Sequence, residues 1–365
     1  MNSVLFRSPQ LQSSFEKDGF VVIDLAGEKE LDVLLAFYAG LRNAPMPGHG
    51  FQVSLDNEDA QFVQRVAETL IGIAGPLLER HFQDHQVFTA SFVVKETNPA
   101  GIVPPHQDWT FVDETRYWSA TVWCPLQDVG LENGALGLIS GSHNWYDHVR
   151  PSPSPYYEPP FKDQLALLFP YIRLLELKAG QAVVFNNRTL HASPPNLSGR
   201  PRLGVGIGIT HRDAGLRHYY LLPGNDPSLR PGDRLPGEDP SLIEGYAVER
   251  TFFYHYNNAR LSSLYAAGRR PEDLRSIGSF PVSQRVYAGE ELQRLAEGAG
   301  NRRDDGLWRH LSALPVFASL SPGPPEATPS VGPVQSKQPF WKVYTPKNVY
   351  REIRYRLTKK TIKTP

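Results

Sequence analysis

Cysteine is almost absent from this chain, because only Cys124 occurs among its 365 residues. A single thiol excludes an intrachain disulfide, and it excludes the clusters of thiolates that bind zinc or iron–sulfur centres. The sequence therefore predicts a protein of the reducing cytoplasm. Any metal ion would be bound by nitrogen and oxygen atoms.

An excess of either charge is also missing, because 38 Lys and Arg are balanced by 38 Asp and Glu. No global field attracts nucleic acid, so we expect no nucleic-acid partner. No segment reaches the roughly 20 apolar residues of a membrane span, and the first residues lack the pattern of a signal peptide. With 40% hydrophobic residues, the chain has enough apolar material for a sizeable soluble core.

Helical signals dominate residues 1–87, which we expect to form a helical scaffold. Pro9 and Gly19 mark the start and the end of a short helix, and a strand follows at 20–25. Helical periodicity returns over 28–41 and over 58–78.

Strand-like runs separated by turn residues begin at Phe88. This pattern predicts an antiparallel sandwich or jelly roll as an all-β core over about 88–212. The runs are 87–96, 117–129, 134–139, 181–186 and 202–210.

Proline-rich stretches divide the rest of the chain. Residues 150–163 predict a loop over the sheet opening, and helical and loop additions, with an irregular region at 221–241, are expected over 213–320. Residues 321–336 contain closely spaced prolines and predict an extended linker. We therefore expect one domain over 1–320 and a separate tail over 337–365.

The tail, residues 337–365, carries nine Lys and Arg against one acid, Glu352. Val349, Ile353 and Leu357 recur every four residues, so the tail predicts a basic amphipathic helix. Such a helix suits an anionic membrane surface or an acidic partner. The alternative is that the tail folds back onto the acidic body of its own domain. The sequence does not indicate an oligomeric state.

His106 and Asp108 are candidate metal ligands. Residues i and i+2 of an extended segment point to the same side, so an imidazole and a carboxylate can converge on one ion. His191 stands in a predicted turn between two strands, the second of which begins with Arg202. If these strands are antiparallel neighbours, His191 and Arg202 lie side by side. Two histidines and one carboxylate are the usual ligands of an iron that keeps open positions.

A competing pair is His81 and His85, spaced four residues apart at the end of a predicted helix. The dipole at a helix C-terminus favours histidine without any metal, and no third ligand occurs nearby. We therefore interpret these histidines as part of the helix end.

The ordered motifs resemble the phytanoyl-CoA dioxygenase-like family of iron(II)/2-oxoglutarate oxygenases. The matching pieces are "FEKDGFVVI", "HQD" at 106–108, "ENGALGLISGSH" at 132–143 and "AGQAVVFNNRTLHASPPNLSGRPR" at 179–202. The resemblance implies a double-stranded β-helix, that is, a cupin-like jelly roll, with added helices. It also implies Fe(II), the co-substrate 2-oxoglutarate and O2 as cofactors.

The resemblance assigns roles residue by residue. His106, Asp108 and His191 would ligate iron, and Arg202 with Ser193 would hold the distal carboxylate of 2-oxoglutarate. The remaining matching positions imply supporting side chains at Gln107, Trp123 and Asn196, turn glycines at Gly134 and Gly141, and a pocket-facing side chain at His143.

The implied activity is hydroxylation of an organic small molecule or lipid-like substrate, with release of succinate and CO2. Desaturation and ring formation stay open. The alternatives are a barrel that binds metal without catalysis, as a binding or sensing module, and a non-redox metal enzyme. An aromatic lid is expected from Trp109, Phe111, Tyr156, Tyr157 and Phe161, although these side chains would equally suit the closing of a core.

Overall fold

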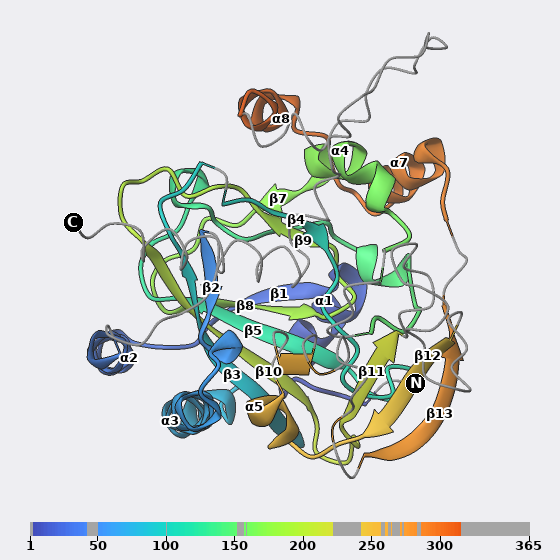
Figure 1. The fold of residues 1–365 in the computed structure, drawn as a ribbon. Helices are drawn as coiled ribbons and strands as arrows, with labels where there is room; N and C mark the ends of the chain where they lie inside the picture. The colour runs from blue at the N-terminus through green and yellow to red at the C-terminus, as the bar shows by residue number, and fades with distance from the viewer. Residues whose placement is uncertain are drawn as a thin grey trace, which may run out of the picture.

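The computed structural model describes residues 3–41, 50–99, 101–151, 157, 159–221, 242–256, 260–261, 264, 271, 274–282 and 286–314. This part of the chain consists of antiparallel β-sheets with helices packed around them (Figure 1). The prediction of a β-rich core with added helices is confirmed. Within these residues, no helix combines the length and the apolar character needed to cross a bilayer.

The first helix forms where the capping signals predict it. α1 (Pro9–Asp18) begins after Ser8, whose side chain accepts a hydrogen bond from a backbone amide of the first turn. It ends at Gly19, whose φ of 80° is the left-handed conformation that glycine tolerates best. The expected strand follows as β1 (Phe20–Asp24).

The scaffold also contains α2 (Glu28–Gly40) and α3 (Ala60–Leu78), both at predicted positions. It is not purely helical, because β1 and β2 (Phe51–Val53) join the largest sheet. That sheet has six strands in the order β1-β8-β5-β10-β3-β2. Its other strands are β3 (His85–Lys95), β5 (Ser119–Pro125), β8 (Gln181–Asn186) and β10 (Arg202–His211).

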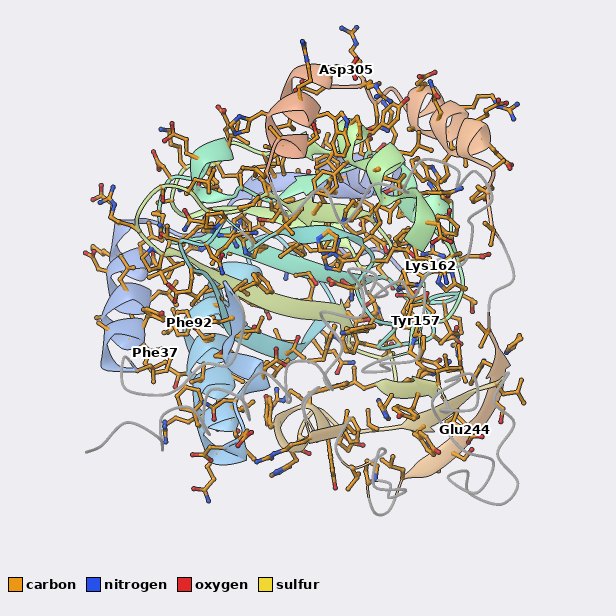
Figure 2. The ribbon with its side chains drawn as sticks, turned by 45° about the horizontal axis from the view of Figure 1, so that its top comes forward. Phe37, Phe92, Tyr157, Lys162, Glu244 and Asp305 are labelled. Atoms are coloured by element: carbon orange, nitrogen blue, oxygen red, sulfur yellow. The ribbon has the colours of Figure 1, made fainter. Side chains whose placement is uncertain are left out.

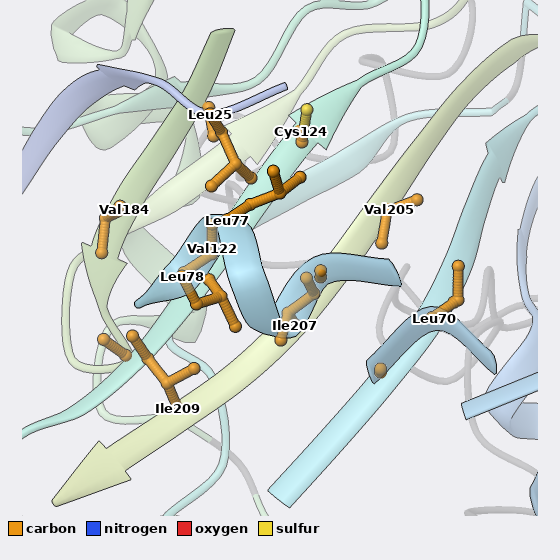
Figure 3. Packing of buried hydrophobic residues seen from close by; sticks show 14 of the residues in the cluster. Leu25, Leu70, Leu77, Leu78, Val122, Cys124, Val184, Val205, Ile207 and Ile209 are labelled. Carbon is orange, nitrogen blue, oxygen red and sulfur yellow. The ribbon is translucent and has the colours of Figure 1, made fainter. Parts of the chain in front are cut away.

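One face of the six-stranded sheet packs against the helices. Val205, Ile207 and Ile209 point from β10 into the same cluster as Leu77 and Leu78 of α3 (Figure 3). Burial of each such side chain stabilises the fold by roughly 1.5–3 kcal/mol. On the same face, α2 packs on β3, because the ring centroids of Phe37 and Phe92 are 5.7 Å apart (Figure 2).

A four-stranded sheet has the order β4-β9-β6-β7. It contains His191, which begins a short strand instead of lying in the predicted turn. The expected antiparallel pairing of the two strands on either side of His191 is wrong, because β8 pairs with β1 and β5 whereas β10 pairs with β5 and β3. The chain crosses between sheets after β9. The strands are β4 (Val103–His106), β6 (Gly137–Leu138), β7 (Arg173–Leu174) and β9 (His191–Ser193).

The region 213–320 differs from its prediction as helices and loops, because it includes a three-stranded sheet in the order β11-β12-β13. Its strands are β11 (Arg217–Leu221), β12 (Leu242–Ala247) and β13 (Arg275–Pro281). The described helices outside the scaffold are α4 (Leu165–Leu168), α5 (Phe252–His255), α7 (Gly289–Gly298) and α8 (Asp305–Ser312). Short 3-10 turns lie at Ser54–Asp56, Leu131–Asn133, Ser142–Asn144, Lys162–Gln164 and Phe169–Tyr171.

Several predictions lie outside the described residues. They are the linker 321–336, the tail 337–365, Tyr156, and nearly all of the irregular region 221–241.

Candidate metal centre and anion site

His106, Asp108 and His191 converge as the sequence predicts. His106 and His191 are direct partners in the antiparallel pairing of β4 with β9, and their ring centroids are 4.1 Å apart. Asp108 Oδ1 lies 3.9 Å from Nε2 of His106 and 3.6 Å from Nε2 of His191. The three potential ligand atoms lie within 4.8 Å of one another, and no other such group of three is found among the described residues.

Backbone carbonyls set the orientation of both imidazoles. Nδ1 of His106 lies 2.8 Å from the Pro104 carbonyl oxygen, and Nδ1 of His191 lies 2.9 Å from that of Thr189. In this geometry Nδ1–H donates, which leaves the Nε2 lone pairs for a metal ion. Burial, followed by the neighbouring His191, lowers the pKa of His106 to about 4. The neutral imidazole that a metal requires is therefore favoured at neutral pH.

Asp108 is held from several sides. Its Oδ2 accepts a hydrogen bond of 3.1 Å from the hydroxyl of Thr121 on β5, and its amide donates to the Asn187 carbonyl at 2.8 Å. The guanidinium of Arg150 donates through Nε to the Asp108 carbonyl at 2.5 Å. Arg150 is itself only 1% exposed and forms a 2.6 Å ion pair with Glu114. Sequence reasoning missed Thr121 and Arg150.

Arg202 lies in a fully enclosed position. It is 2% exposed, its guanidinium carbon stands 4.9 Å above the Trp123 ring, and NH1 donates to the Gly134 carbonyl. NH1 also lies 3.4 Å from Oγ of Ser193. Burial lowers the pKa of Arg202 to about 9.

A second buried cation, Lys95, stands directly opposite Arg202 in the pairing of β3 with β10. Lys95 is 0% exposed, and its Nζ donates to Oγ and to the carbonyl of Ser193 at 2.7 and 3.1 Å. Burial, and next the charge of Arg202, lower the pKa of Lys95 well below its ordinary value. Sequence reasoning missed this residue, because only the strand register brings it to Arg202.

Neither cation forms an ion pair with a carboxylate in the described part of the chain. Burying a charge without a counter-charge is costly, so two adjacent buried cations mark a site for an anion. We refer to Lys95, Arg202 and Ser193 as the anion site.

The other predicted site residues lie around this arrangement. The Nε2 of Gln107 donates to the carbonyls of Arg188 and Tyr146 at 2.6 and 3.4 Å. Asn196 donates to the carbonyls of Lys95 and Arg200 at 2.9 and 2.7 Å, and so braces the connection from β9 to β10.

The two turn glycines and His143 are structural in this fold. Gly134 and Gly141 have φ of 72° and 74°, which agrees with their interpretation as turn glycines. The expectation that His143 faces the pocket is wrong, because its Nε2 lies 3.1 Å from the Glu16 carbonyl of α1. His81 and His85 lie beyond the end of α3, and His85 belongs to β3, so they do not share a helix face.

Of the predicted lid aromatics, Trp109 and Phe111 line a pocket, whereas Phe161 is part of a core. Phe161 is buried and its ring centroid lies 5.3 Å from that of Tyr146, so it closes a core. Phe111 packs at 4.9 Å against Phe88. Tyr157 is hydrogen-bonded to His148.

The sheets and the triad define a β-sheet protein with a candidate mononuclear metal centre of two imidazoles and one carboxylate, next to a candidate site for an anion. The chain belongs to the phytanoyl-CoA dioxygenase (PhyH) family, whose sequence profile matches residues 15–204. This family consists of iron- and 2-oxoglutarate-dependent oxygenases, so the predicted cofactors Fe(II), 2-oxoglutarate and O2 are those of the family.

The chain is similar to a phytanoyl-CoA dioxygenase of Arabidopsis thaliana, at 30% identity over 139 residues, which cover 35% of this chain and 45% of the relative. It is also similar to phytanoyl-CoA dioxygenase domain-containing protein 1 of Danio rerio, at 31% identity over 121 residues, covering 32% and 42%. The matched region thus spans less than half of either relative.

Among solved structures, the fold is similar to that of SnoK, a non-heme α-ketoglutarate-dependent carbocyclase from nogalamycin biosynthesis. The TM-score is 0.43 at 21% identity, covering 63% of this chain and 94% of SnoK. HygX from Streptomyces hygroscopicus, solved with nickel, 2-oxoglutarate and hygromycin B, gives a TM-score of 0.39 at 14% identity, covering 55% and 86%.

Proposed function

We propose that this protein is an iron(II)- and 2-oxoglutarate-dependent dioxygenase. His106, Asp108 and His191 would hold the iron, and Arg202 and Lys95 would bind the distal carboxylate of 2-oxoglutarate. The observation that carries this proposal is the pair of buried cations without a carboxylate partner beside the triad.

The spacing along β9 fits a short dicarboxylate. His191 and Ser193 are two residues apart on one strand, so their side chains point to the same side about 7 Å from each other. A five-carbon dicarboxylate held by a metal at His191 would therefore be long enough to reach the anion site with its other end. There, Arg202 and Lys95 would neutralise the carboxylate through charge-assisted hydrogen bonds.

The donor set fits iron, because two imidazoles and one carboxylate on one side leave open positions for exogenous ligands. When bound, iron with 2-oxoglutarate and O2 supplies the oxidising chemistry, with release of succinate and CO2. The chain's own residues orient the reactants: Thr121 fixes the Asp108 carboxylate, and Trp123 supports the Arg202 guanidinium. Burial of the anion site keeps water away from the bound carboxylate.

We further propose that the six-stranded and four-stranded sheets form the double-stranded β-helix of this enzyme class. Thr121 from the larger sheet and both histidines from the smaller one meet at Asp108, which supports a site between the two sheets. The most direct reaction is hydroxylation of an organic small molecule or lipid-like compound. Ring formation and desaturation need the same oxidant, and only product analysis separates them.

The cytoplasmic location stays a prediction from the single cysteine, Cys124, which is buried and free. The partition into a 1–320 domain, a linker and a tail also stays a prediction, as does contact of the tail with a membrane or an acidic partner.

The test is formation of succinate from 2-oxoglutarate by the purified full chain, with and without Fe(II). We expect iron-dependent succinate formation, and we expect His106→Ala, Asp108→Ala and His191→Ala each to abolish it, since a missing ligand leaves the metal unfixed. His81→Ala is the matched control and should retain wild-type turnover. Normal turnover in any of the three triad variants would contradict the proposal.

The alternatives predict different results in the same assay. A metal-binding module or a non-redox metal enzyme would bind Fe(II) but form no succinate. Such an enzyme also has no need of the two buried cations, which favours the oxygenase.

A further inference from the structure

A pocket with a volume of about 70 Å³ includes Trp109, Thr110 and Phe111 in its lining. One wall consists of residues 109–111, which directly follow the candidate ligand Asp108. The opposite wall includes Phe252, Phe253 and Tyr256, from α5 and the residue after it. Aromatic rings from two distant parts of the chain therefore line this space together, and the rings of Phe111 and Phe253 pack edge to face with centroids 5.4 Å apart.

The strand register links the pocket to Asp108. Thr89 lines the pocket and is the β3 partner of Gly208, whose partner on β5 is Thr121. Thr121 is hydrogen-bonded to Asp108. Neighbouring strands are about 4.8 Å apart, so Thr89 stands about 10 Å from Thr121 on the same face of the sheet. Gly208 places no side chain between them.

The pocket presents no net charge. Arg217 lines it, but its NH2 is paired with Asp113 at 3.2 Å and its NH1 donates to the hydroxyl of Tyr219 at 3.0 Å. His218 also lines it, and burial lowers the pKa of His218 to about 3, so the ring is neutral at physiological pH. A charged ligand group would lose its hydration here without gaining a partner.

The size of the pocket limits its occupant. An apolar cavity of about 150 Å³ binds a whole benzene ring. A volume of about 70 Å³ therefore suits a branched alkyl group or one edge of a ring.

Part of the lining lies outside the part of the chain that matches the family profile, which ends at residue 204; these lining residues are Arg217, His218, Tyr219, Phe252, Phe253, Tyr256 and Leu261. The region that matches the family profile contains the triad and the anion site, whereas residues beyond that region complete the lining of the pocket. A difference in this segment changes the pocket without changing the metal centre.

We propose that this pocket binds an uncharged hydrocarbon part of the substrate, and that the segment containing β11 and α5 determines substrate specificity. This inference rests on the proposed function and assigns the charged or polar end of any substrate to a position outside the pocket.

The first experiment measures binding of three probes of similar size by ¹⁹F NMR. The probes are fluorobenzene, 4-fluorobenzoate and 4-fluorobenzylammonium, added to the full chain with 2-oxoglutarate present in excess so that the anion site is occupied. We expect fluorobenzene to bind saturably with one edge of its ring in the pocket, and the two charged probes to bind more weakly by about tenfold or more. Equal binding of all three probes would contradict the inference that the pocket prefers uncharged groups.

Variants at Thr89 locate the probe. Thr89 is only partly buried, so Thr89→Phe extends into the pocket with little disturbance of the core, and it should weaken fluorobenzene binding about tenfold or more. Thr89→Val has nearly the same shape and is the matched control, with unchanged binding expected. If Thr89→Phe binds fluorobenzene as tightly as the wild type does, the probe does not bind in this pocket.

A second variant keeps the test decisive if Thr89→Phe fails to fold. Tyr256→Ala enlarges the pocket, so 1-fluoronaphthalene should bind this variant about tenfold more tightly than it binds the wild type. Equal binding to both would contradict the proposal. Far-UV circular dichroism and thermal melting check that each variant is folded.

Substrate-free succinate formation separates the two proposals. If the wild type forms no succinate while the probe pattern holds, the proposed function fails and the hydrocarbon pocket is supported. If succinate forms normally while Thr89→Phe and Tyr256→Ala leave probe binding unchanged, only the pocket is overturned.

Discussion

At the scale of single residues, Arg202 has the clearest expected effect. Its guanidinium is buried on Trp123 and has no carboxylate partner among the described residues, so it would interact mainly with the 2-oxoglutarate carboxylate. Loss of such a buried charge partner costs about 2–5 kcal/mol. We expect Arg202→Met to raise the dissociation constant of 2-oxoglutarate by roughly 30-fold or more. Separate titrations with 2-oxoglutarate and Fe(II) check this, and an equal loss of both affinities would mean that Arg202 is structural.

Lys95 should couple the binding of 2-oxoglutarate to the uptake of a proton. Burial and Arg202 hold the pKa of Lys95 well below 10.5 in the ligand-free protein, whereas a bound carboxylate favours the ammonium and so raises this pKa. We therefore expect 2-oxoglutarate binding to take up a proton, measured by calorimetry in buffers with different ionisation enthalpies. In Lys95→Met the uptake should disappear. Persistent uptake would assign the proton to another group.

The lowered pKa of Lys95 also makes the free energy of unfolding depend on pH. Between the lowered pKa of folded Lys95 and 10.5, the unfolded chain binds more protons than the folded one. The free energy of unfolding of the ligand-free protein should therefore rise with pH across that window. Lys95→Met should flatten this rise, which denaturant titrations at several pH values would detect.

Arg150 and Glu114 form a buried pair that holds the segment carrying Asp108. The pair is 2.6 Å long, and Arg150 also donates to the Asp108 carbonyl and, at 3.0 Å, to that of His148. Removing one member of such a pair costs about 3–5 kcal/mol. We expect Arg150→Met and Glu114→Gln each to lower the free energy of unfolding, and the double variant to lose clearly less than the sum. Additive losses would show that the pair is not coupled.

At the scale of elements, the sequence predicted the positions of the helices, because a helix depends on residues close together in the chain. Pro9 and Gly19 mark the two ends of α1, and apolar residues recur at helical spacing along α3, so both helices were recognisable from sequence. Strand pairing depends on residues far apart in the chain. For this reason the sequence did not reveal that β9 and β10 belong to different sheets, or that β11, β12 and β13 form a third one.

Gly134 connects the 3-10 turn Leu131–Asn133 to the anion site, because the Gly134 carbonyl accepts a hydrogen bond from Arg202. It has φ of 72°, and a Cβ there would lie 2.6 Å from the Pro194 carbonyl oxygen. Gly199 has a similar φ of 78° with nothing within 4 Å of its Cβ position, so it is a matched control. Both alanine variants experience the left-handed strain of roughly 1–2 kcal/mol. We expect Gly134→Ala alone to lose more than this, and also to weaken 2-oxoglutarate binding in calorimetry. Equal effects of the two variants would contradict the connection.

At the scale of the whole molecule, the candidate site joins segments from both large sheets. The motif positions His106, Asp108 and His191 were predictable, because their residue types and order carry the resemblance to the family. Lys95 and Thr121 were not, since an isolated lysine and an isolated threonine in strands have no local signature. They reach the site only through their register with β10.

The tail, residues 337–365, makes the distribution of charge along the chain uneven. It carries a net charge of +8 by sequence, and the chain is neutral overall, so the preceding 336 residues carry −8. Opposite charges favour return of the tail onto its own domain, and each basic residue near an anionic membrane would contribute about 1 kcal/mol there instead. The candidate site lies within residues 95–202, so the tail is not required for it in either case.

We therefore expect deletion of residues 337–365 to leave iron-dependent succinate formation within about twofold of the full chain. Co-sedimentation with vesicles of anionic and of neutral lipids, at low and high salt, distinguishes the two positions of the tail. Attraction to a charged surface weakens as salt shortens the screening length, to about 10 Å at 0.1 M. If the full chain binds anionic vesicles in a salt-sensitive way and the truncated chain does not, the tail binds the membrane surface. If neither protein sediments, the tail lies on its own domain or binds another protein, and a large loss of turnover on deletion would show that it supports the catalytic domain.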